Sequence, residues 1–426
     1  MQRRDALAGL ASVLVSTGCL RLQDAGGAGT ESATRTSATA TSTATNTRTT
    51  TQSTERPETT EAETTTETED SAGPPVTGTS RSFAYDAANT GYYDAAGLTD
   101  KPRKAWTVSF SDAITTVPAI VDGTLYVSAD GLAALDARTG EERWSAGTGG
   151  RSSPSVHDGT VYSSDYRTVG AYDAESGDAL WEAEANASRL TVADGLVVAA
   201  GDEGVAAIDA ETGSVQWRVL TQRRFDSAPA VVDGTVYVAD RPRDQPGRLS
   251  ALDLDTGDRQ WQYEVDEADG SGAHYYFTGE PVYADGTVFL ACENRVAYAV
   301  DAETGTEVWQ TTTMGGLNPA PAVVDETVYF GQDGGAVLAL DSQTGNIEWE
   351  ARDGTGSIVS NVVATQESVF VVDDSGLLVA YDRSNGNSRY KLGLARSRAR
   401  CGPLVLDDWL FVGDGDGTLH AFTTEN

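Results

Sequence analysis

Apolar and polar residues alternate in short runs along the chain after residue 80, and turn-forming residues separate the runs. The stretch VAAIDAETGSVQW, from Val205 to Trp217, is typical: an apolar run, an acidic turn with a glycine, and a second run that carries a tryptophan. Alternation of this kind, bounded by Asp and Gly, is the pattern of β-strands with one buried face. The pattern therefore predicts strands joined by tight turns.

The same order of residue types, D-x-x-T/S-G-x-x-x-W, recurs along the rest of the chain. Copies of the stretch cover residues 132–144, 170–181, 205–217, 249–261, 296–309, 337–349 and 378–390. Their aromatic residues are Trp144, Trp181, Trp217, Trp261, Trp309, Trp349 and Tyr390, at steps of 37, 36, 44, 48, 40 and 41 residues. A period near 40 residues with several strand signals per unit predicts a β-propeller.

Asp-Gly pairs mark the first hairpin of the units, because both positions of such a turn tolerate positive φ. They occur at 122–123, 158–159, 194–195, 233–234 and 285–286, so each unit has four strands. Trp106 lies 38 residues before Trp144, whereas the C-terminal GDGDGTLHAFTTEN has strands but no aromatic anchor. We expect the strand around Trp106 to complete the last blade and to close an all-β, eight-bladed ring of four-stranded antiparallel blades.

The motif residues have structural roles in this fold. Asp209 accepts backbone N–H groups in the turn, and Gly213 provides a left-handed conformation. Trp217 packs on the next blade and donates its indole N–H to a carbonyl there. Seven near-copies make poor active sites, so we expect a docking role for Trp106, Trp144, Trp181, Trp217, Trp261, Trp309 and Trp349.

Charge narrows the class of partner. Asp and Glu total 64 against 30 for Lys and Arg, and the net charge of -34 excludes nucleic acid because most of the surface repels phosphate. Lysine occurs only at Lys101, Lys104 and Lys391, and this acid-rich, lysine-poor composition resembles that of proteins from halophilic microbes. An ordinary acidic extracellular protein is the alternative.

The N-terminus has the layout of an export signal. Residues 1–18 carry Arg3 and Arg4 before a short apolar run, which resembles a twin-arginine signal, and Ser16 to Cys19 resembles a lipobox. We predict lipidation of Cys19; a free thiol inside a cleaved signal peptide is the alternative. Residues 19–80, rich in Thr, Ser and Glu, form a disordered stalk, and residues 81–426 the propeller. The expected location is the cell surface, lipid-anchored to the outer side of the cytoplasmic membrane.

The repeat resembles the tryptophan-docking motif of the PQQ-like propellers, over roughly residues 83–426. That family includes quinoprotein alcohol dehydrogenases and non-catalytic, BamB-like lipoproteins, and FAYDAANTG (83–91) resembles the lead-in of haloarchaeal members. Members of that family that bind PQQ hold calcium through carboxylate and amide ligands and have a disulfide between adjacent cysteines. If this chain bound PQQ, the resemblance implies that it would have the same features. Here the cysteines besides Cys19 are Cys292 and Cys401, too far apart to expect a disulfide. No cofactor and no metal are expected, with PQQ as the alternative.

Other candidate chemistry is sparse. His157, His274 and His420 each stand alone in a unit and are interpreted as packing or surface residues. Asp414-Gly-Asp-Gly lacks the full ligand series of a calcium loop and is interpreted as a solvated turn. Asn186-Ala-Ser is a glycosylation acceptor sequence on a connection between blades.

Strand alternation assigns the loops to two faces of the ring. The first and third turns of each blade, such as 122–123 and 136–140, share one face, here called the first-turn face, which is acidic. The second turns and the connections between blades form the opposite, connection face. Arginines gather there, together with the loops 239–248 and 266–281 that contain Tyr275, Tyr276 and Phe277. The candidate recognition residues are Arg151, Arg189, Arg223, Arg224, Arg241, Arg243, Arg396, Arg398, Arg400, Tyr275 and Tyr276; Arg167 and Arg295 lie on the same face.

These observations predict a non-catalytic, tethered, monomeric scaffold that binds an envelope or extracellular protein, since arginine and exposed aromatics suit a protein interface. Serine at Arg223, Arg224, Arg396 and Arg398 is expected to abolish partner capture. Simple pairing of the arginines with nearby Asp and Glu is the alternative. Two other functions stay open: a PQQ-dependent dehydrogenase or sensor, and a carbohydrate- or solute-binding head.

Overall fold

A computed structural model describes residues 75–147, 150, 152–220, 223–242, 245–265, 275–317, 319–353, 356–394 and 401–424. The chain divides into two units, Met1–Glu67 and Thr68–Asn426, and the described residues belong to the second. Their regular structure is entirely β-strand, and among them no helix is long and apolar enough to cross a membrane. The predicted signal segment, Cys19 and the stalk up to residue 74 lie outside the described residues.

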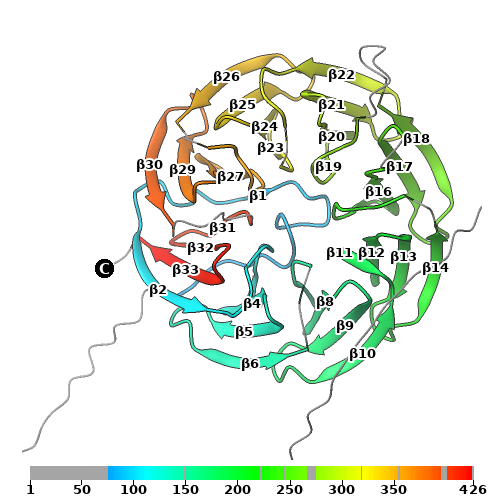
Figure 1. The fold of residues 1–426 in the computed structure, drawn as a ribbon, viewed down its shortest axis with the longest axis vertical. Helices are drawn as coiled ribbons and strands as arrows, with labels where there is room; N and C mark the ends of the chain where they lie inside the picture. The colour runs from blue at the N-terminus through cyan, green and yellow to red at the C-terminus, as the bar shows by residue number, and fades with distance from the viewer. Residues whose placement is uncertain are drawn as a thin grey trace, which may run out of the picture. The chain divides into compact units, whose positions relative to one another are not determined.

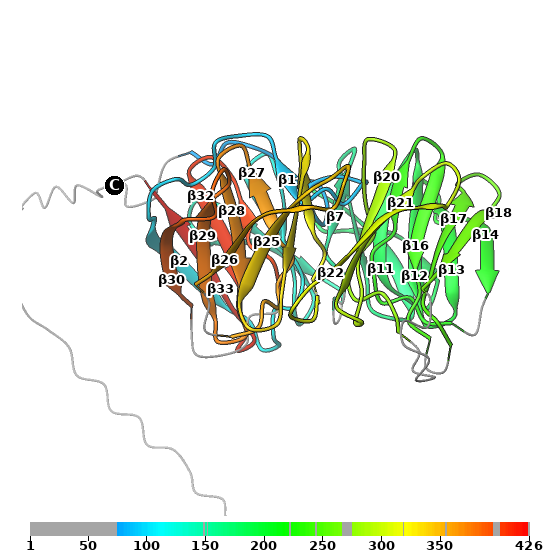
Figure 2. The same cartoon turned by 90° about the horizontal axis from the view of Figure 1, so that it is seen from above.

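The strands form eight sheets arranged around a common axis, which confirms the predicted eight-bladed propeller (Figure 1). In each blade the first strand lies nearest the axis and the last strand at the rim (Figure 1). Seen from the side, the strands run across the thickness of the ring, so their turns meet at two opposite faces (Figure 2).

Blades 1 to 4 follow the chain in simple antiparallel order. Their strands are β3 (Ala119–Val121), β4 (Thr124–Ser128), β5 (Leu132–Asp136) and β6 (Glu142–Ala146); β7 (Ser155–His157), β8 (Thr160–Ser164), β9 (Thr168–Asp173) and β10 (Ala179–Glu184); β11 (Ala187–Ala193), β12 (Leu196–Gly201), β13 (Gly204–Asp209) and β14 (Val215–Leu220); and β15 (Ala230–Val232), β16 (Thr235–Ala239), β17 (Arg248–Asp253) and β18 (Arg259–Glu264).

Blades 5 to 7 repeat this order, and blade 8 joins the two ends of the described chain. Their strands are β19 (Val282–Ala284), β20 (Thr287–Ala291), β21 (Val296–Asp301) and β22 (Glu307–Thr312); β23 (Ala322–Val324), β24 (Thr327–Gly331), β25 (Ala336–Asp341) and β26 (Ile347–Arg352); β27 (Val363–Thr365), β28 (Ser368–Val372), β29 (Leu377–Asp382) and β30 (Ser388–Gly393); and β31 (Leu404–Val405), β32 (Trp409–Gly413), β33 (Thr418–Thr423) and β2 (Arg103–Ser109).

The Asp-Gly turns have the backbone that the sequence predicts. In blade 3, Asp194 has φ 49° and Gly195 has φ 74°, and the other Asp-Gly pairs are alike. Positive φ at both positions is the type I′ turn, whose twist matches that of the flanking strands.

Ring closure also follows the prediction. β2 pairs antiparallel with β33, with Trp106 opposite Ala421, so the last blade takes its outer strand from the N-terminal side. A further strand was not predicted: β1 (Tyr92–Tyr93) lies parallel to β27 and makes the sheet of blade 7 five-stranded. It belongs to the segment that precedes β2 and runs through the middle of the ring (Figure 1).

Candidate functional site

The docking tryptophans join neighbouring blades everywhere except between blades 7 and 8, where the anchor Tyr390 donates its hydroxyl to the carbonyl of Leu98 in the lead-in. Each indole N–H donates to a main-chain carbonyl one residue beyond the motif aspartate of the following blade, at 2.7 to 3.2 Å. The acceptors for Trp106, Trp144, Trp181, Trp217, Trp261, Trp309 and Trp349 are, in order, Ala137, Ala174, Ala210, Leu254, Ala302, Ser342 and Arg383. The repeat residues therefore have a structural role, because they connect neighbouring blades.

The motif glycine has a second role that the sequence reasoning missed. Gly213 has φ +72°, but a Cβ there would also lie 2.7 Å from the ring of Trp181. The indole of one blade thus lies flat against the glycine of the next. The constant spacing of glycine and tryptophan along the repeat was the available signal for this contact.

The motif aspartates organise their own turns. The Oδ1 of Asp209 accepts the main-chain N–H and the hydroxyl of Thr212 at 2.8 and 2.7 Å, and these bonds lower the pKa of its carboxyl. In blades 1 and 7 the motif aspartate also pairs with an arginine: Arg143 with Asp136 and Arg389 with Asp382, each at 2.7 Å.

The axis of the ring is filled by the lead-in, residues 80–98, which contacts the inner edges of most blades. The carbonyls of Ser80, Arg81, Ala87, Ala88, Thr90 and Gly91 accept N–H groups of the inner strands at 2.7 to 2.9 Å; the donors are Ile120, Val156, Val231, Tyr283, Val323 and Ala364. In blade 8, the donor Val405 N–H binds the hydroxyl of Tyr85 at 2.8 Å. Inner strands would otherwise present unpaired edges, so the lead-in satisfies them.

Asn89 holds the lead-in at the axis. Its side chain is 1% exposed, and its Nδ2 donates to the carbonyls of Ala228, Pro229 and Pro281 at 3.1 to 3.2 Å. These acceptors lie directly before the first strands of blades 4 and 5, β15 and β19. The segment that the sequence singled out only by resemblance, residues 83–91, is therefore part of the core.

Two buried carboxyl groups lie near this segment. Burial raises the pKa of Asp86, although Thr90 donates both its hydroxyl and its N–H to the carboxylate. Burial also raises the pKa of Glu280, whose Oε1 lies 4.0 Å from Nε of Arg189. The partners of these carboxyl groups hold the lead-in and the approach to blade 5 in place, which is a structural role.

Three observations concern the alternative of a quinone held by calcium. The axis is occupied by the lead-in, and Asn89 there is bonded to protein carbonyls. In the part of the chain that the structure describes, no group of three or more His, Cys, Asp or Glu side chains is placed to hold a metal ion. Cys292 and Cys401 are free, buried thiols, and burial raises the pKa of each to about 12.

Four arginines of the connection face pair with nearby groups: Arg189, Arg223, Arg224 and Arg241. Arg223 is buried: its guanidinium forms a two-bond pair with Asp240 and also binds Gln245 and the carbonyl of Pro246. Arg224 pairs with Asp226 and Asp202, and the Asp226 carboxylate raises the pKa of this guanidinium. Because breaking a buried pair costs about 3–5 kcal/mol, serine at Arg223 disturbs the fold and tests no surface.

The aromatic loop is less exposed than the sequence indicates. Phe277 is 4% exposed and pairs with Cys292, and Tyr275 is half-buried against the core of blades 4 and 5. Tyr276 is also half-buried, with the guanidinium of Arg241 over its ring at 4.2 Å and a hydrogen bond from Arg241 to its hydroxyl. The structure thus brings Arg224, Arg241 and Tyr276 together around Asp226. Arg151, Arg243, Arg396, Arg398 and Arg400 lie outside the described residues.

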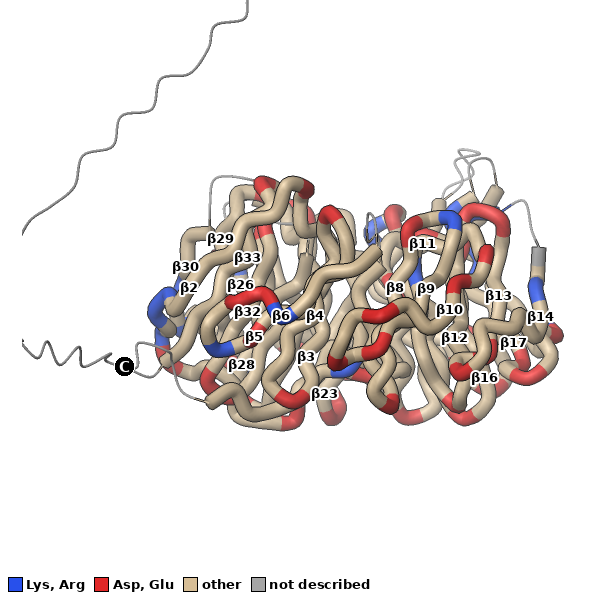
Figure 3. The backbone as a smooth tube through the Cα atoms, turned by 90° about the horizontal axis from the view of Figure 1, so that it is seen from below, with Lys and Arg blue, Asp and Glu red and all other residues tan. Residues whose placement is uncertain are grey.

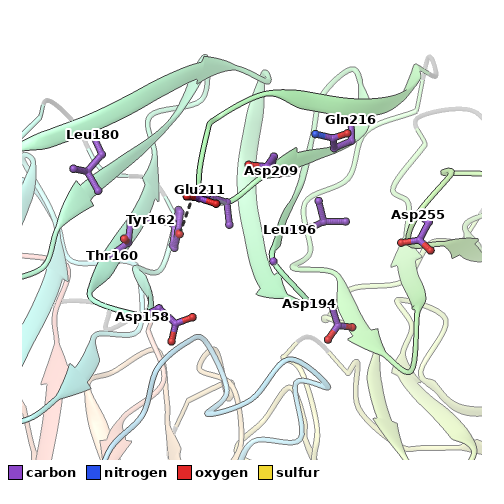
Figure 4. Close-up of a pocket in the computed structure, with 12 residues that line it drawn as sticks. Asp158, Thr160, Tyr162, Leu180, Asp194, Leu196, Asp209, Glu211, Gln216 and Asp255 are labelled. Atoms are coloured by element: carbon purple, nitrogen blue, oxygen red, sulfur yellow. Dashed lines mark hydrogen bonds between the residues drawn. The ribbon is translucent and has the colours of Figure 1, made fainter.

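The first-turn face carries a groove between blades 2 and 3, with a volume of 790 Å³ (Figure 4). Acidic positions recur in the turns along this face, the lower edge in Figure 3. The groove is lined by Asp158, Thr160, Tyr162, Leu180, Asp194, Gly195, Leu196, Asp209, Ala210, Glu211, Gln216 and Asp255. None of these lining residues is basic. Sequence reasoning described the face as acidic but did not find the groove.

The remaining candidates occupy structural positions. His420 is buried with its Nε2 2.9 Å from Oδ2 of Asp414, and His157 is half-buried at the end of β7. Asp414 is fully buried and accepts N–H groups of Asp416 and Thr418, so the solvated-turn interpretation fits only the exposed Asp416. His274 lies outside the described residues. Asn186 is at an exposed connection, bonded to Glu203, and its glycosylation stays a prediction.

Comparison with known proteins identifies the family. Residues 128–350 and 350–426 match the PQQ-like family described as "Outer membrane protein assembly factor BamB". The chain belongs to this family. Membership accounts for the repeat and the docking motif, because both are spread over the matched residues.

Relatives of this BamB family member include an outer membrane protein assembly factor and a serine/threonine-protein kinase. The outer membrane protein assembly factor BamB of Salmonella typhimurium is 34% identical over 97 residues, which cover 22% of this chain and 24% of that protein. The serine/threonine-protein kinase AfsK of Streptomyces coelicolor is 29% identical over 271 residues, 52% of this chain and 33% of the kinase. The chain thus spans a third or less of the length of these relatives.

Solved structures show the same fold at low identity. BamB from Moraxella catarrhalis superposes with a TM-score of 0.65 at 18% identity, covering 76% of this chain and 100% of that chain. The quinohemoprotein alcohol dehydrogenase of Comamonas testosteroni gives a TM-score of 0.67 at 16% identity, and the superposition covers 84% of this chain and 81% of that chain. Since BamB and an alcohol dehydrogenase share this fold, the fold does not determine the function, which depends on the site residues.

Proposed function

We propose that the protein is a non-catalytic scaffold, tethered at the cell surface, that binds another envelope or extracellular protein through its connection face. The family description and the Salmonella relative both name an outer-membrane assembly factor, which supports an envelope location and a role in protein assembly. The filled axis supports a function without a bound quinone, because a cofactor of that size needs a concave site.

The surface cluster of Tyr166, Arg224, Arg241 and Tyr276 carries the proposal. Tyr166 is 53% exposed, and its phenol is close enough to act on the charge of Arg224. The side chains of Arg224 and Arg241 are 53% and 49% exposed. Tyrosine and arginine dominate the residues that contribute most to protein binding. The buried Arg223–Asp240 pair holds the adjoining loop, so this cluster is presented on a rigid support.

The point where the chain enters the ring agrees with this assignment. Gly78 packs beside Tyr93 and Leu406, and Leu406 adjoins the first hairpin of blade 8, on the first-turn face. Gly78, near the start of the described residues, therefore lies on the first-turn face, opposite the proposed recognition surface.

The proposal is tested by photo-crosslinking in the cell of origin. A photoreactive residue at position 166 is expected to form a defined crosslinked product with a partner protein, identified by mass spectrometry. The double variant Arg224→Ser and Arg241→Ser should lose that product. Arg352→Ser, an exposed arginine in blade 6 paired only with its neighbour Glu350 in the described chain, is the matched control and should keep it. Equal crosslinking in all three proteins contradicts the proposal.

A spectral titration with PQQ and calcium at high salt separates the scaffold from a quinoprotein. The scaffold is expected to give no saturable change in the quinone spectrum. A stoichiometric change would instead favour the dehydrogenase or sensor.

A further inference from the structure

We infer that the groove between blades 2 and 3 is a second docking site, which takes an extended, basic segment of a partner protein that carries Lys or Arg beside aliphatic side chains. The site is on the first-turn face, opposite the Tyr166 and Arg241 cluster. The two proposals can therefore be tested separately, because a negative result for the connection face does not affect the groove.

The charge of the groove is the first argument. Its acidic lining residues are Asp158, Asp194, Asp209, Glu211 and Asp255, contributed by turns of blades 2, 3 and 4, and no lining residue is basic. Figure 4 shows Asp158 and Asp194 at one end of the groove, with Asp209 and Glu211 further along it. Carboxylates that face a shared concave surface attract cationic groups and strengthen binding by direct charged hydrogen bonds.

Comparison among the blades shows how an arginine can compensate this charge. The position directly before the aromatic anchor is Arg143 in blade 1 and Arg389 in blade 7, and both arginines pair with the motif aspartate of their own blade. The same position is Leu180 in blade 2 and Gln216 in blade 3. The groove thus lacks the arginine that pairs with the motif aspartate in blades 1 and 7.

A second groove provides an internal comparison. Between blades 6 and 7 a cavity of 440 Å³ is lined by acidic residues but also by Arg383 and Arg389. Arg383 pairs with Asp325 at 2.9 Å, across the two blades. The repeat therefore builds similar hollows, and in this one arginines at two positions, directly after the motif aspartate and directly before the anchor, pair with the carboxylates.

The apolar residues of the groove decide the kind of cation. Leu180, from blade 2, is 54% exposed although it is a large aliphatic side chain, and Leu196 lines the groove from blade 3 (Figure 4). A Lys or Arg side chain uses both surfaces at once, because its methylene stem packs on aliphatic groups while its head binds carboxylates. A bare metal ion makes no use of Leu180, and the described carboxylates do not gather as metal ligands. A basic peptide is the occupant that matches both features.

Titration calorimetry with a synthetic peptide of alternating lysine and leucine tests the inference. The wild-type chain should bind it saturably, with an affinity that falls as salt rises because charged contacts are screened. The variant Leu180→Arg places an arginine where blades 1 and 7 have theirs and should weaken binding about tenfold or more. Val308→Arg makes the same charge change directly before the anchor of blade 5, where Val308 is 48% exposed, and should leave affinity within about twofold.

Three results would overturn the inference. The first is a wild-type protein that does not bind the lysine–leucine peptide. The second is an equal loss in Leu180→Arg and Val308→Arg, which would show attraction to the overall negative charge. The third is saturable Ca²⁺ binding at the groove with no peptide binding. None of these results depends on crosslinking at Tyr166, so the two surfaces are judged separately.

Discussion

The indole nitrogen of Trp106 lies 3.2 Å from the carbonyl oxygen of Ala137, so the strand that completes blade 8 docks onto blade 1 by the contact used between successive blades. Trp106 also packs on Phe411 of its own blade, with ring centroids 5.9 Å apart. The contact that closes the ring is therefore the same indole-to-carbonyl hydrogen bond that the other docking tryptophans make.

Removing the Trp106 ring should open that joint. Trp106→Phe keeps most of the apolar area but loses the hydrogen bond, and we expect a cost of about 1 kcal/mol. Trp106→Ala removes the ring as well, and we expect about 3 kcal/mol. Denaturant unfolding measures both, with Leu180→Ala at the exposed rim as control. A near-normal stability of Trp106→Ala would contradict a role in closure.

The two kinds of glycine in blade 3 should respond differently to alanine. Gly195 has φ +74° and open space where a Cβ would lie, whereas at Gly213, φ +72°, a Cβ would lie 2.7 Å from the Trp181 ring. Gly195→Ala should cost about 1 kcal/mol from the left-handed backbone alone. Gly213→Ala adds the displacement of Trp181 and should cost clearly more in thermal unfolding. Equal costs would show that the ring moves freely.

Asn89 should be sensitive to loss of its amide donors. Asn89→Asp keeps the size of the side chain but replaces the Nδ2 group by an oxygen that faces the carbonyls of Ala228, Pro229 and Pro281. We expect a loss of about 3 kcal/mol or more, since buried partners are left unpaired next to a charge. Asn385→Asp, in an exposed turn, is the control. Similar melting temperatures for the two variants would argue against the lead-in as part of the core.

Glu280 should make stability depend on pH. Burial raises its pKa in the folded protein above the unfolded value, despite Arg189 nearby, so the folded state favours the protonated carboxyl. Its contribution is present below the unfolded pKa and is lost as pH rises through the folded pKa. Glu280→Gln should therefore gain stability relative to wild type as pH rises from about 5 to about 8. The exposed Glu142→Gln provides the control, and parallel pH profiles for Glu280→Gln and wild type would refute the assignment.

The blades were predictable because their signals are local. Asp194 and Gly195 specify a hairpin between neighbouring strands, and Trp217 lies a fixed distance from its own turn, so spacing along the chain reveals spacing in the fold. Closure of the ring was predictable because the C-terminal unit has no aromatic anchor, whereas Trp106 near the N-terminal side is an anchor without a unit of its own.

The axis and the two surfaces depend on contacts that the local pattern does not contain. Asn89 contacts Ala228 and Pro281, 139 and 192 positions away, and residues 80–98 have no repeat to reveal this. The sequence showed arginines on one face, but it did not show that Arg223 is buried against Asp240. The groove lined by Leu180 is formed by residues of blades 2, 3 and 4, and the local sequence pattern does not show that these residues face one another.

The lead-in imposes an order on folding. Tyr85 binds both the N–H and the carbonyl of Val405, 320 positions later in the chain. During synthesis, the lead-in has no partner in blade 8 until nearly the entire chain exists. Middle blades form from local hairpins, whereas the axis and the closing sheet must wait for long-range contacts, which are slow to form. We therefore expect the lead-in and the last blade to be the last parts of the propeller to become ordered.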